Sequence, residues 1–284
     1  MSTIHVPALD EFPEHRNLLE RAVAHFQPDP RVVGLMVSGS IAGGRMDFYS
    51  DVDLDIRVDD DHFDAVFAER ARAAEAVGDP FFCFDADHLP FENHFYIVLY
   101  PGPVKLDFLY GRASALEPQS GWADFLILKD RDGLLAEVKA KSQGLDAPPP
   151  DHKRLHSLNQ KFWTWCWYVF GKIVRGEWWE ALDGVHAIRT LAVVPMLGWA
   201  THTRQEGYRR LEQKLDPATA DRLAATVATL RRDSLYAALV AEIALFRDLR
   251  DRVFEQHGLT FDRAGEQALE KAIVQRWSAD SPTG

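Results

Sequence analysis

Alternating apolar and polar residues in the first half of the chain indicate the central strands of a β-sheet. An apolar run covers residues 32–37, Gly39 and Ser40 follow as a turn, and residues 51–58 then place an apolar side chain at every second position. Alternation is typical of strands, and glycine next to serine is typical of turns. The pattern predicts a strand, a tight turn with a short helix, and a second strand.

The remaining pattern before residue 147 predicts helices around a sheet. Helices are expected at about 11–27, 59–77, 122–128 and 132–141, and strands at about 81–84, 95–100 and 104–110. Pro101, Gly102 and Pro103 form a hairpin signal, so the last two strands are expected to pair antiparallel.

The chain changes character at the proline run 148–150, which cannot continue a helix. Beyond it, apolar residues recur at intervals of three and four, and helices are expected at about 152–175, 177–200, 204–214, 217–231, 234–257 and 263–277. We therefore expect an α+β protein with a mixed sheet and flanking helices over 1–147, an all-helical bundle over 151–278, and a tail over 279–284.

Composition narrows the class of protein. The chain has 284 residues, 46% of them hydrophobic, and no run approaches the eighteen apolar residues of a membrane span. The first residues lack a basic stretch followed by an apolar one, so no secretory signal is expected. Cys83 and Cys166 are too few for a disulfide scaffold, and we expect both to be buried, reduced thiols in a cytoplasmic protein.

Charge differs between the two halves. Residues 1–150 carry a net charge of −13 and residues 151–284 a net charge of +2, which together give the −11 of the whole chain. A strongly acidic half argues against a long nucleic acid as partner, which needs a basic track. It suits a small cationic ligand, although plain solubility explains the same excess.

Two aspartates in the second predicted strand form the strongest chemical signal. Asp51 and Asp53 are two residues apart, so their carboxylates point to one face at about 6.6 Å spacing along the strand, and Asp55 continues the row. Like charges this close repel each other, and a divalent cation is the usual remedy. An exposed Asp-x-Asp also arises by chance.

Gly39-Ser40, Gly44 and the segment Ser50-Asp51-Val52-Asp53-Leu54, at this separation, resemble the signature of the DNA polymerase β-like nucleotidyltransferase superfamily. The resemblance implies transfer of a nucleoside monophosphate, here AMP from ATP, to an acceptor with release of pyrophosphate. It implies two Mg²⁺ ions as cofactors.

The resemblance also implies roles for individual residues. A third carboxylate on a neighbouring strand completes the catalytic and metal-binding set, and Asp107 is the candidate; the alternative is a solvated aspartate on an edge strand. The residues implied to contact the nucleotide in this region are Gly39, Ser40, Gly44, Arg45 and Ser50.

A second informative stretch runs from Phe162 to Arg189, where five of the eight tryptophans lie close to basic residues. It is similar to the helical domain of the aminoglycoside and lincosamide nucleotidyltransferases, which closes over the nucleotide. The similarity implies that Lys172 reaches the triphosphate with Arg175 in reserve. It also implies an acceptor pocket lined by Trp178, Trp179 and Glu180; a tryptophan-rich core and a surface lysine are the alternatives.

The base that takes the acceptor's proton is left open by the sequence. Some antibiotic-modifying relatives carry a glutamate four residues before the helical-domain lysine, where this chain has Tyr168. Glu92, as base or acceptor ligand, is the first candidate and Glu180 the second. Glu92 is alternatively a plain loop carboxylate.

The functional hypothesis is a metal-dependent nucleotidyltransferase that adenylylates a hydroxyl of a small cationic acceptor such as an aminoglycoside or lincosamide antibiotic, acting as a monomer or homodimer without a membrane partner. One alternative is nucleotidylation of a protein or RNA, as in antitoxin-like enzymes, and another is a nucleotide-binding module without catalysis. A ribonuclease centred on Arg252 and His257 is a further alternative, resting on an Arg-x4-His spacing that chance produces readily.

Overall fold

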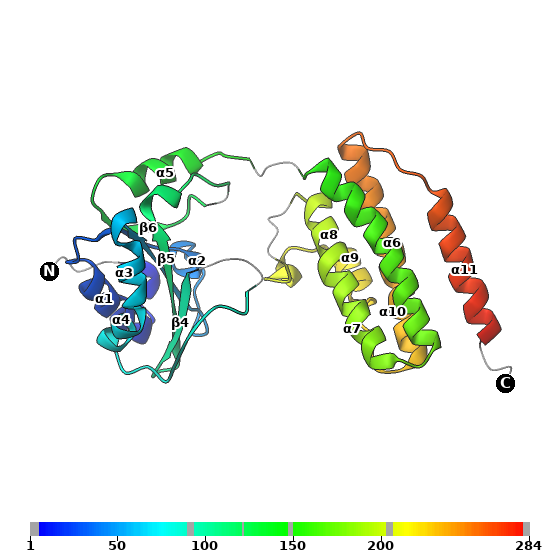
Figure 1. Cartoon of the computed structure of the whole chain (residues 1–284), viewed down its shortest axis with the longest axis horizontal. Helices are drawn as coiled ribbons and strands as arrows, with labels where there is room; N and C mark the ends of the chain where they lie inside the picture. The colour runs from blue at the N-terminus through cyan, green and yellow to red at the C-terminus, as the bar shows by residue number, and fades with distance from the viewer. Residues whose placement is uncertain (1–5, 90–93, 121, 147–149, 203–206, 281–284) are drawn as a thin grey trace. The chain divides into compact units, whose positions relative to one another are not determined.

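The chain divides into two compact units, Met1–Pro148 and Pro149–Gly284 (Figure 1). The computed structural model describes all residues except 1–5, 90–93, 121, 147–149, 203–206 and 281–284. The first unit contains a sheet with helices and the second is helical, which confirms the predicted fold class.

Six strands, five α-helices and three short 3₁₀ helices lie in the described part of the first unit, and the strands and α-helices position the site. In chain order they are α1 Pro13–Phe26, β1 Val32–Val37, α2 Gly39–Ala42, β2 Val52–Val58, α3 Phe63–Ala68, α4 Arg70–Val77, β3 Phe82–Asp85, β4 Phe95–Tyr100, β5 Val104–Arg112, β6 Leu126–Asp130 and α5 Leu134–Ser142.

The strands form one sheet in the order β3-β4-β5-β2-β1-β6. β2 and β5 run parallel to each other, and every other neighbouring pair is antiparallel, including the predicted β4–β5 hairpin. The parallel pair lies in the middle of the sheet. Asp107 on β5 is therefore in a central strand and not on an edge.

One face of the sheet is covered by α1, α3 and α4 (Figure 1). Val52, Leu54 and Ile56 of β2 point into this core and are fully buried, as the alternation predicts. Helix α1 begins at Pro13, which suits the first helical position because its missing N–H has no partner to lose there. Burial of its apolar side fixes α1 to the sheet.

The other face carries a smaller core beneath α5, which packs on β1 and β6. The predicted helix over 122–128 is wrong at this place, because residues from Leu126 onward form β6 and pair antiparallel with β1. The short apolar run here has no decisive period, so backbone pairing with the open edge of β1 determines its structure.

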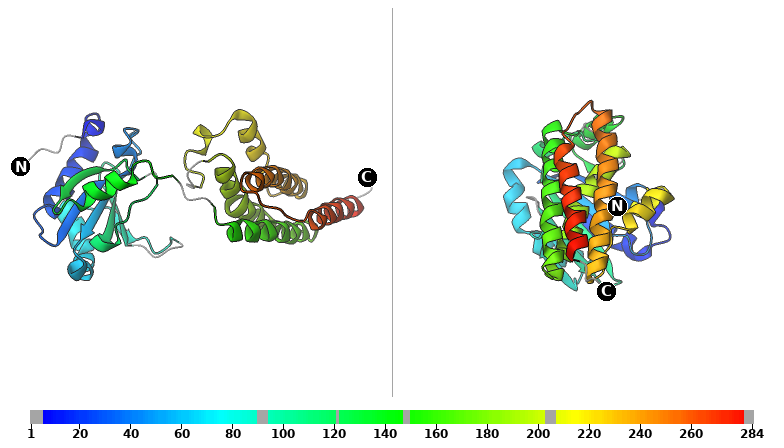
Figure 2. Two further views of the ribbon diagram at one scale, coloured as in Figure 1. Left: turned by 90° about the horizontal axis from the view of Figure 1, so that it is seen from above. Right: turned by 90° about the vertical axis from the view of Figure 1, so that its right-hand side faces the viewer.

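The second unit is a helical bundle with its own apolar core (Figure 2). Its helices are α6 His152–Val174, α7 Trp178–Ile188, α8 Val194–Ala200, α9 Pro217–Ala224, α10 Arg232–Gln256 and α11 Ala264–Asp280. Asp151 caps α6 by accepting a hydrogen bond from the Lys153 N–H, and α10 and α11 both pack against α6.

Two expected helices of this unit are shorter than predicted. The segment expected over 204–214 has only a 3₁₀ turn at Leu211–Gln213 among its described residues, and the helix expected from 217 ends at Ala224. The helix expected over 177–200 contains a wider π turn at Arg189–Val193. Pro195 lacks a backbone N–H and so cannot complete the regular ladder there.

Cys83 is exposed, contrary to expectation, whereas Cys166 is buried. The four residues of β3 are all exposed, and β3 is an edge strand of the sheet. Among the described residues, no helix combines the length and the apolar character that crossing a membrane requires.

Candidate functional site

Three aspartates converge on the face of the sheet that points away from the main core. Asp51 precedes β2, Asp53 lies on β2, and Asp107 is the direct partner of Asp53 in the parallel ladder to β5. One carboxylate oxygen from each of the three lies within 4.8 Å of the others, and all three residues are half-buried. The structure therefore brings together the predicted carboxylate set.

The turn after β1 packs directly against this cluster. Gly39 has a φ of +67°, and a Cβ atom built on it would lie 2.2 Å from Asp53 Oδ2. The Ser38 N–H donates a hydrogen bond to the Asp53 carbonyl oxygen at 3.2 Å. Only glycine can occupy position 39 without moving the Asp53 carboxylate.

Ser40 is the second residue of the short helix α2, next to Gly39 in the chain. Its hydroxyl oxygen is buried and has no hydrogen-bond partner among the described residues. A buried hydroxyl without a partner is uncommon, because losing water without compensation costs free energy. A hydroxyl group without a partner can donate a hydrogen bond to an acceptor such as a phosphate oxygen.

The other predicted nucleotide contacts lie in the loop that joins α2 to β2. Gly44 adopts a φ of +61° with open space around it, and Arg45 is exposed. The Ser50 hydroxyl closes the loop by donating to Asp47 Oδ1 at 3.1 Å and accepting from the Asp47 N–H at 2.9 Å. Ser50 thus has a structural task in ordering the approach to Asp51.

Asp55 does not continue the wet acidic row that the alternation indicates. It is only 4% exposed and pairs with Arg57 at 2.6 Å, between Asp55 Oδ2 and Arg57 Nη2. Burial raises the pKa of Asp55 above its ordinary value, against the opposing effect of Arg57. The neighbouring strand β1 and the core under α5 cover this end of β2, so Asp55 lies apart from the solvent-accessible cluster.

Lys105 is a residue of the site that the sequence reasoning missed. Its ammonium nitrogen lies 2.8 Å from a carboxylate oxygen of Asp51 and 2.8 Å from one of Asp107. Burial opposes its charge, but hydrogen bonds to Asp107 and Asp51 outweigh burial and raise the pKa of Lys105. The signal was present, because residues 105 and 107 share one face of a strand.

A second polar cluster lies in the helical unit, at the turn between α6 and α7. Lys172 Nζ lies 2.5 Å from Glu177 Oε2 and 2.9 Å from Glu180 Oε2, and Arg175 Nε lies 2.5 Å from Glu177 Oε1. Lys172 and then Arg175 lower the pKa of Glu177 to about 2. The two predicted cations therefore share one carboxylate.

Exposed aromatic rings surround this second cluster. Trp179 is 75% exposed and Trp178 40%, and Lys172 lies over the Tyr168 ring at 5.1 Å. These large apolar side chains at the surface are more informative than buried ones, because exposure of tryptophan needs a reason. The tryptophans of this turn do not belong to the core of the bundle.

Of the two candidates for the general base, only Glu180 lies among the described residues. Glu92 lies outside the described residues. Glu180 accepts a hydrogen bond from the Tyr168 hydroxyl and pairs with Lys172, and these two contacts, in that order, lower its pKa. A lowered pKa weakens a general base.

The aspartate cluster can hold a hard divalent cation. Carboxylate oxygens suit Mg²⁺, and one from each of Asp51, Asp53 and Asp107 lies within a small volume. The donor set therefore fits the metal that the resemblance implies.

Comparisons with known proteins bear on the family. No curated protein sequence matches the chain significantly. A solved structure described as an aminoglycoside 6-adenyltransferase from Bacillus subtilis is similar at 16% sequence identity, covering 92% of this chain and 97% of that chain, with a TM-score of 0.46. The family model described as streptomycin adenylyltransferase matches residues 14–274. That match spans both units and confirms the resemblance to aminoglycoside nucleotidyltransferases, so the chain belongs to the streptomycin adenylyltransferase family.

Proposed function

We propose that the protein transfers an adenylyl group from ATP to a hydroxyl of a small cationic acceptor of the aminoglycoside type. The acceptor oxygen bonds to the α-phosphorus, the bond from that phosphorus to the pyrophosphate oxygen breaks, pyrophosphate leaves, and the hydroxyl proton passes to a base. Membership of an adenylyltransferase family favours this reaction over the other nucleotide chemistries.

The observation that carries the proposal is the grouping of Asp51, Asp53 and Asp107 beside the Gly39-Ser40 turn. The three carboxylates are the proposed holders of Mg²⁺, which supplies charge neutralisation at the phosphates and activation of the acceptor hydroxyl when bound. The Ser40 hydroxyl, which lacks a described partner, is the proposed donor to a phosphate oxygen.

The other substrate contacts and the base are proposed for residues outside the aspartate cluster. Lys172 and Arg175 are the proposed partners of the triphosphate, and both are held near the surface by Glu177. Trp178, Trp179 and Glu180 are the proposed acceptor contacts, because exposed rings beside carboxylates suit a cationic sugar. Glu92 is the proposed base.

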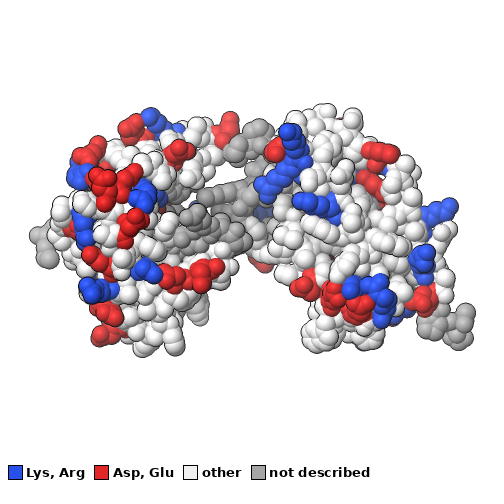
Figure 3. All heavy atoms as spheres, in the orientation of Figure 1, with Lys and Arg blue, Asp and Glu red and all other residues white. Residues whose placement is uncertain are grey.

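Charge and family together support the proposed acceptor class. A net charge of −13 over residues 1–150 attracts a polycation. Among the residues that the structure describes, basic side chains on the face in Figure 3 are interspersed with acidic ones, an arrangement that does not favour RNA. Streptomycin is the first acceptor to test, since the matching family carries that description.

The test is pyrophosphate release from each of the four nucleoside triphosphates with Mg²⁺, screened over streptomycin, other aminoglycosides, lincosamides and unrelated hydroxyl compounds. We expect release that depends on ATP and one cationic acceptor. Asp53→Asn is expected to lower pyrophosphate release at least about a thousandfold, because the cluster loses a carboxylate that is proposed to hold Mg²⁺. The fold is expected to survive, because position 53 is half-buried on a polar face.

Two results would contradict the proposal. Full activity of Asp53→Asn with Mg²⁺ would remove the carboxylate cluster from the reaction. If no small molecule stimulates pyrophosphate release although the protein binds ATP with Mg²⁺, the acceptor would instead be a protein or an RNA.

A further inference from the structure

Lys105 contacts two of the three aspartates in the cluster, and one of them, Asp51, is distant in the sequence. It lies on β5 two residues before Asp107, so the two side chains share a face. Its ammonium joins β5 to the residue that precedes β2, contacting Asp51 at 2.8 Å and both oxygens of Asp107 at 2.8 and 3.0 Å. The Lys105 side chain is 40% exposed and that of Asp107 only 16%, so the bridge is partly shielded from water.

The ammonium and a divalent cation need the same oxygens. The atoms of Asp51 and Asp107 that Lys105 contacts belong to two of the three carboxylates that could hold an ion. A divalent cation binds carboxylate oxygens at short distance, and a second positive charge within about 4 Å is repelled in a partly shielded site. The two cations therefore compete.

The bridge also has a favourable side. Three carboxylates with oxygens within 4.8 Å of one another repel, and one ammonium offsets part of that repulsion. It also joins the start of β2 to β5 through side chains and so holds the carboxylates together. A lysine here keeps the cluster assembled at a lower net charge.

We propose that Lys105 is a positioning residue that sets the divalent-cation affinity of the Asp51–Asp53–Asp107 cluster by acting as an internal, displaceable cation. The inference rests on the proposed function, since it concerns the same cluster. Binding of a divalent ion displaces the ammonium from Asp51 and Asp107, and this exchange weakens binding relative to a cluster without the lysine.

The test measures Mn²⁺ binding to the full chain by the loss of the free-ion electron paramagnetic resonance signal, without nucleotide or acceptor. Lys105→Met removes the charge and keeps the apolar stem, and we expect it to bind Mn²⁺ about tenfold more tightly than the unaltered protein. Lys105→Arg keeps the charge and is expected to stay within about threefold.

Matched variants separate the possible causes. Lys141→Met removes a lysine of the same unit that pairs with Glu137 at the surface, and it is expected to leave Mn²⁺ affinity unchanged. Asp53→Asn is expected to lose binding. Thermal unfolding checks each variant, and Lys105→Gln replaces Lys105→Met if the latter does not fold.

The outcomes are distinguishable. Tighter binding by Lys105→Met alone supports the proposal. Equal or weaker binding by Lys105→Met, while Asp53→Asn loses binding, overturns the role of Lys105 and leaves the proposed metal site standing. Binding that Asp53→Asn does not alter removes the metal site itself and the proposal for Lys105 with it.

Discussion

At the scale of single residues, the geometry of the cluster depends on the absence of a side chain at position 39. Gly39 combines a positive φ with direct packing against Asp53. Gly133, at the start of α5, also has a positive φ of +75° but has open space around it. The two glycines share their backbone conformation and differ in what a methyl group would meet.

Gly39→Ala is therefore expected to lower the transfer rate by at least about a hundredfold, because the new methyl group displaces the Asp53 carboxylate. Gly133→Ala carries a similar backbone strain of about 1 kcal/mol and is expected to keep its activity. Steady-state kinetics and thermal unfolding of both variants provide the check. Equal losses of activity would contradict the packing argument.

Glu242 is a buried carboxyl group in the bundle that the proposed reaction does not use. It is fully buried on α10, and neither of its oxygens has a hydrogen-bond partner among the described residues. Arg189 Nη1 lies 4.0 Å from one of them, which is too long for a hydrogen bond. Burial therefore outweighs Arg189 and raises the pKa of Glu242 to about 9.

This raised pKa predicts a pH-dependent effect of Glu242→Gln. In the unfolded chain the Glu242 carboxyl ionises as the pH rises above its ordinary pKa of 4.5. In the folded protein it stays neutral until the pH approaches its raised pKa of about 9. The stability of the unaltered protein is thus lost progressively over that window, and glutamine avoids the loss. Between pH 5 and pH 8 the variant should gain roughly 2 to 4 kcal/mol relative to the unaltered protein.

Denaturant unfolding at pH 5, 6, 7 and 8 measures this gain for Glu242→Gln. A difference between the two proteins that does not change with pH would show that Glu242 is ionised in the folded state.

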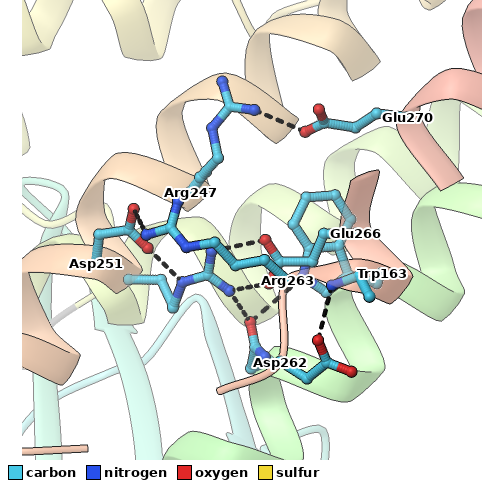
Figure 4. Close-up of polar contacts among 10 residues, drawn as sticks. Trp163, Arg247, Asp251, Asp262, Arg263, Glu266 and Glu270 are labelled. Atoms are coloured by element: carbon cyan, nitrogen blue, oxygen red, sulfur yellow. Dashed lines mark hydrogen bonds and ion pairs between the residues drawn. The ribbon is translucent and has the colours of Figure 1, made fainter. Parts of the chain in front are cut away.

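At the scale of elements, the last helix is attached through a buried ion pair. Arg250 of α10 is fully buried and donates to Glu266 of α11, with 2.9 Å between Arg250 Nη2 and Glu266 Oε2. It also donates to Asn159 of α6 at 2.6 Å and stacks on Phe261. Figure 4 shows the ion pairs around Asp251 and Glu266 that join α10 to the start of α11.

Glu266→Ala is expected to destabilise the helical unit by about 3 to 5 kcal/mol, because the buried Arg250 then loses its buried carboxylate partner and keeps only the more exposed carboxylate of Asp251. Glu270→Ala breaks a pair between the same two helices, Arg247–Glu270, whose side chains are 37% and 30% exposed, and should cost about 1 kcal/mol or less. Seven of the eight tryptophans lie in this unit, so their fluorescence follows its unfolding. Similar losses in the two variants would contradict the importance of burial.

At the scale of the whole molecule, charge is unevenly divided along the chain, with a net −13 before residue 151 and +2 after it. Charges in water are screened beyond about 10 Å at 0.1 M salt, so attraction of a polycation by this acidic half weakens as salt is added.

The KM for streptomycin is expected to rise about tenfold between 50 mM and 500 mM KCl, while kcat changes little. The KM for ATP, an anion, is not expected to rise in parallel. Initial-rate kinetics at four salt concentrations make the comparison, and a streptomycin KM independent of salt would mean that the acidic half serves solubility alone.

The sequence by itself determined most of the local elements and the placing of Asp51 and Asp53 on one face. Alternation along one strand is enough to place Asp51 and Asp53 together, and the glycine-serine turn with these aspartates was enough to identify a family resemblance that the match over residues 14–274 confirms. Helical periodicity likewise sufficed for α6 and α10, because long amphipathic patterns have one interpretation.

Tertiary structure decided everything that depends on residues far apart in the chain. Parallel pairing of β2 with β5 makes Asp107 the neighbour of Asp53 and brings Lys105 to Asp51, and pairing with β1 makes residues 126–130 a strand. Asp55 is likewise buried because β1, which is distant in the sequence, pairs with this part of β2. Strand partners and the covering of a face are fixed by long-range packing, which leaves no signal within a short stretch of sequence.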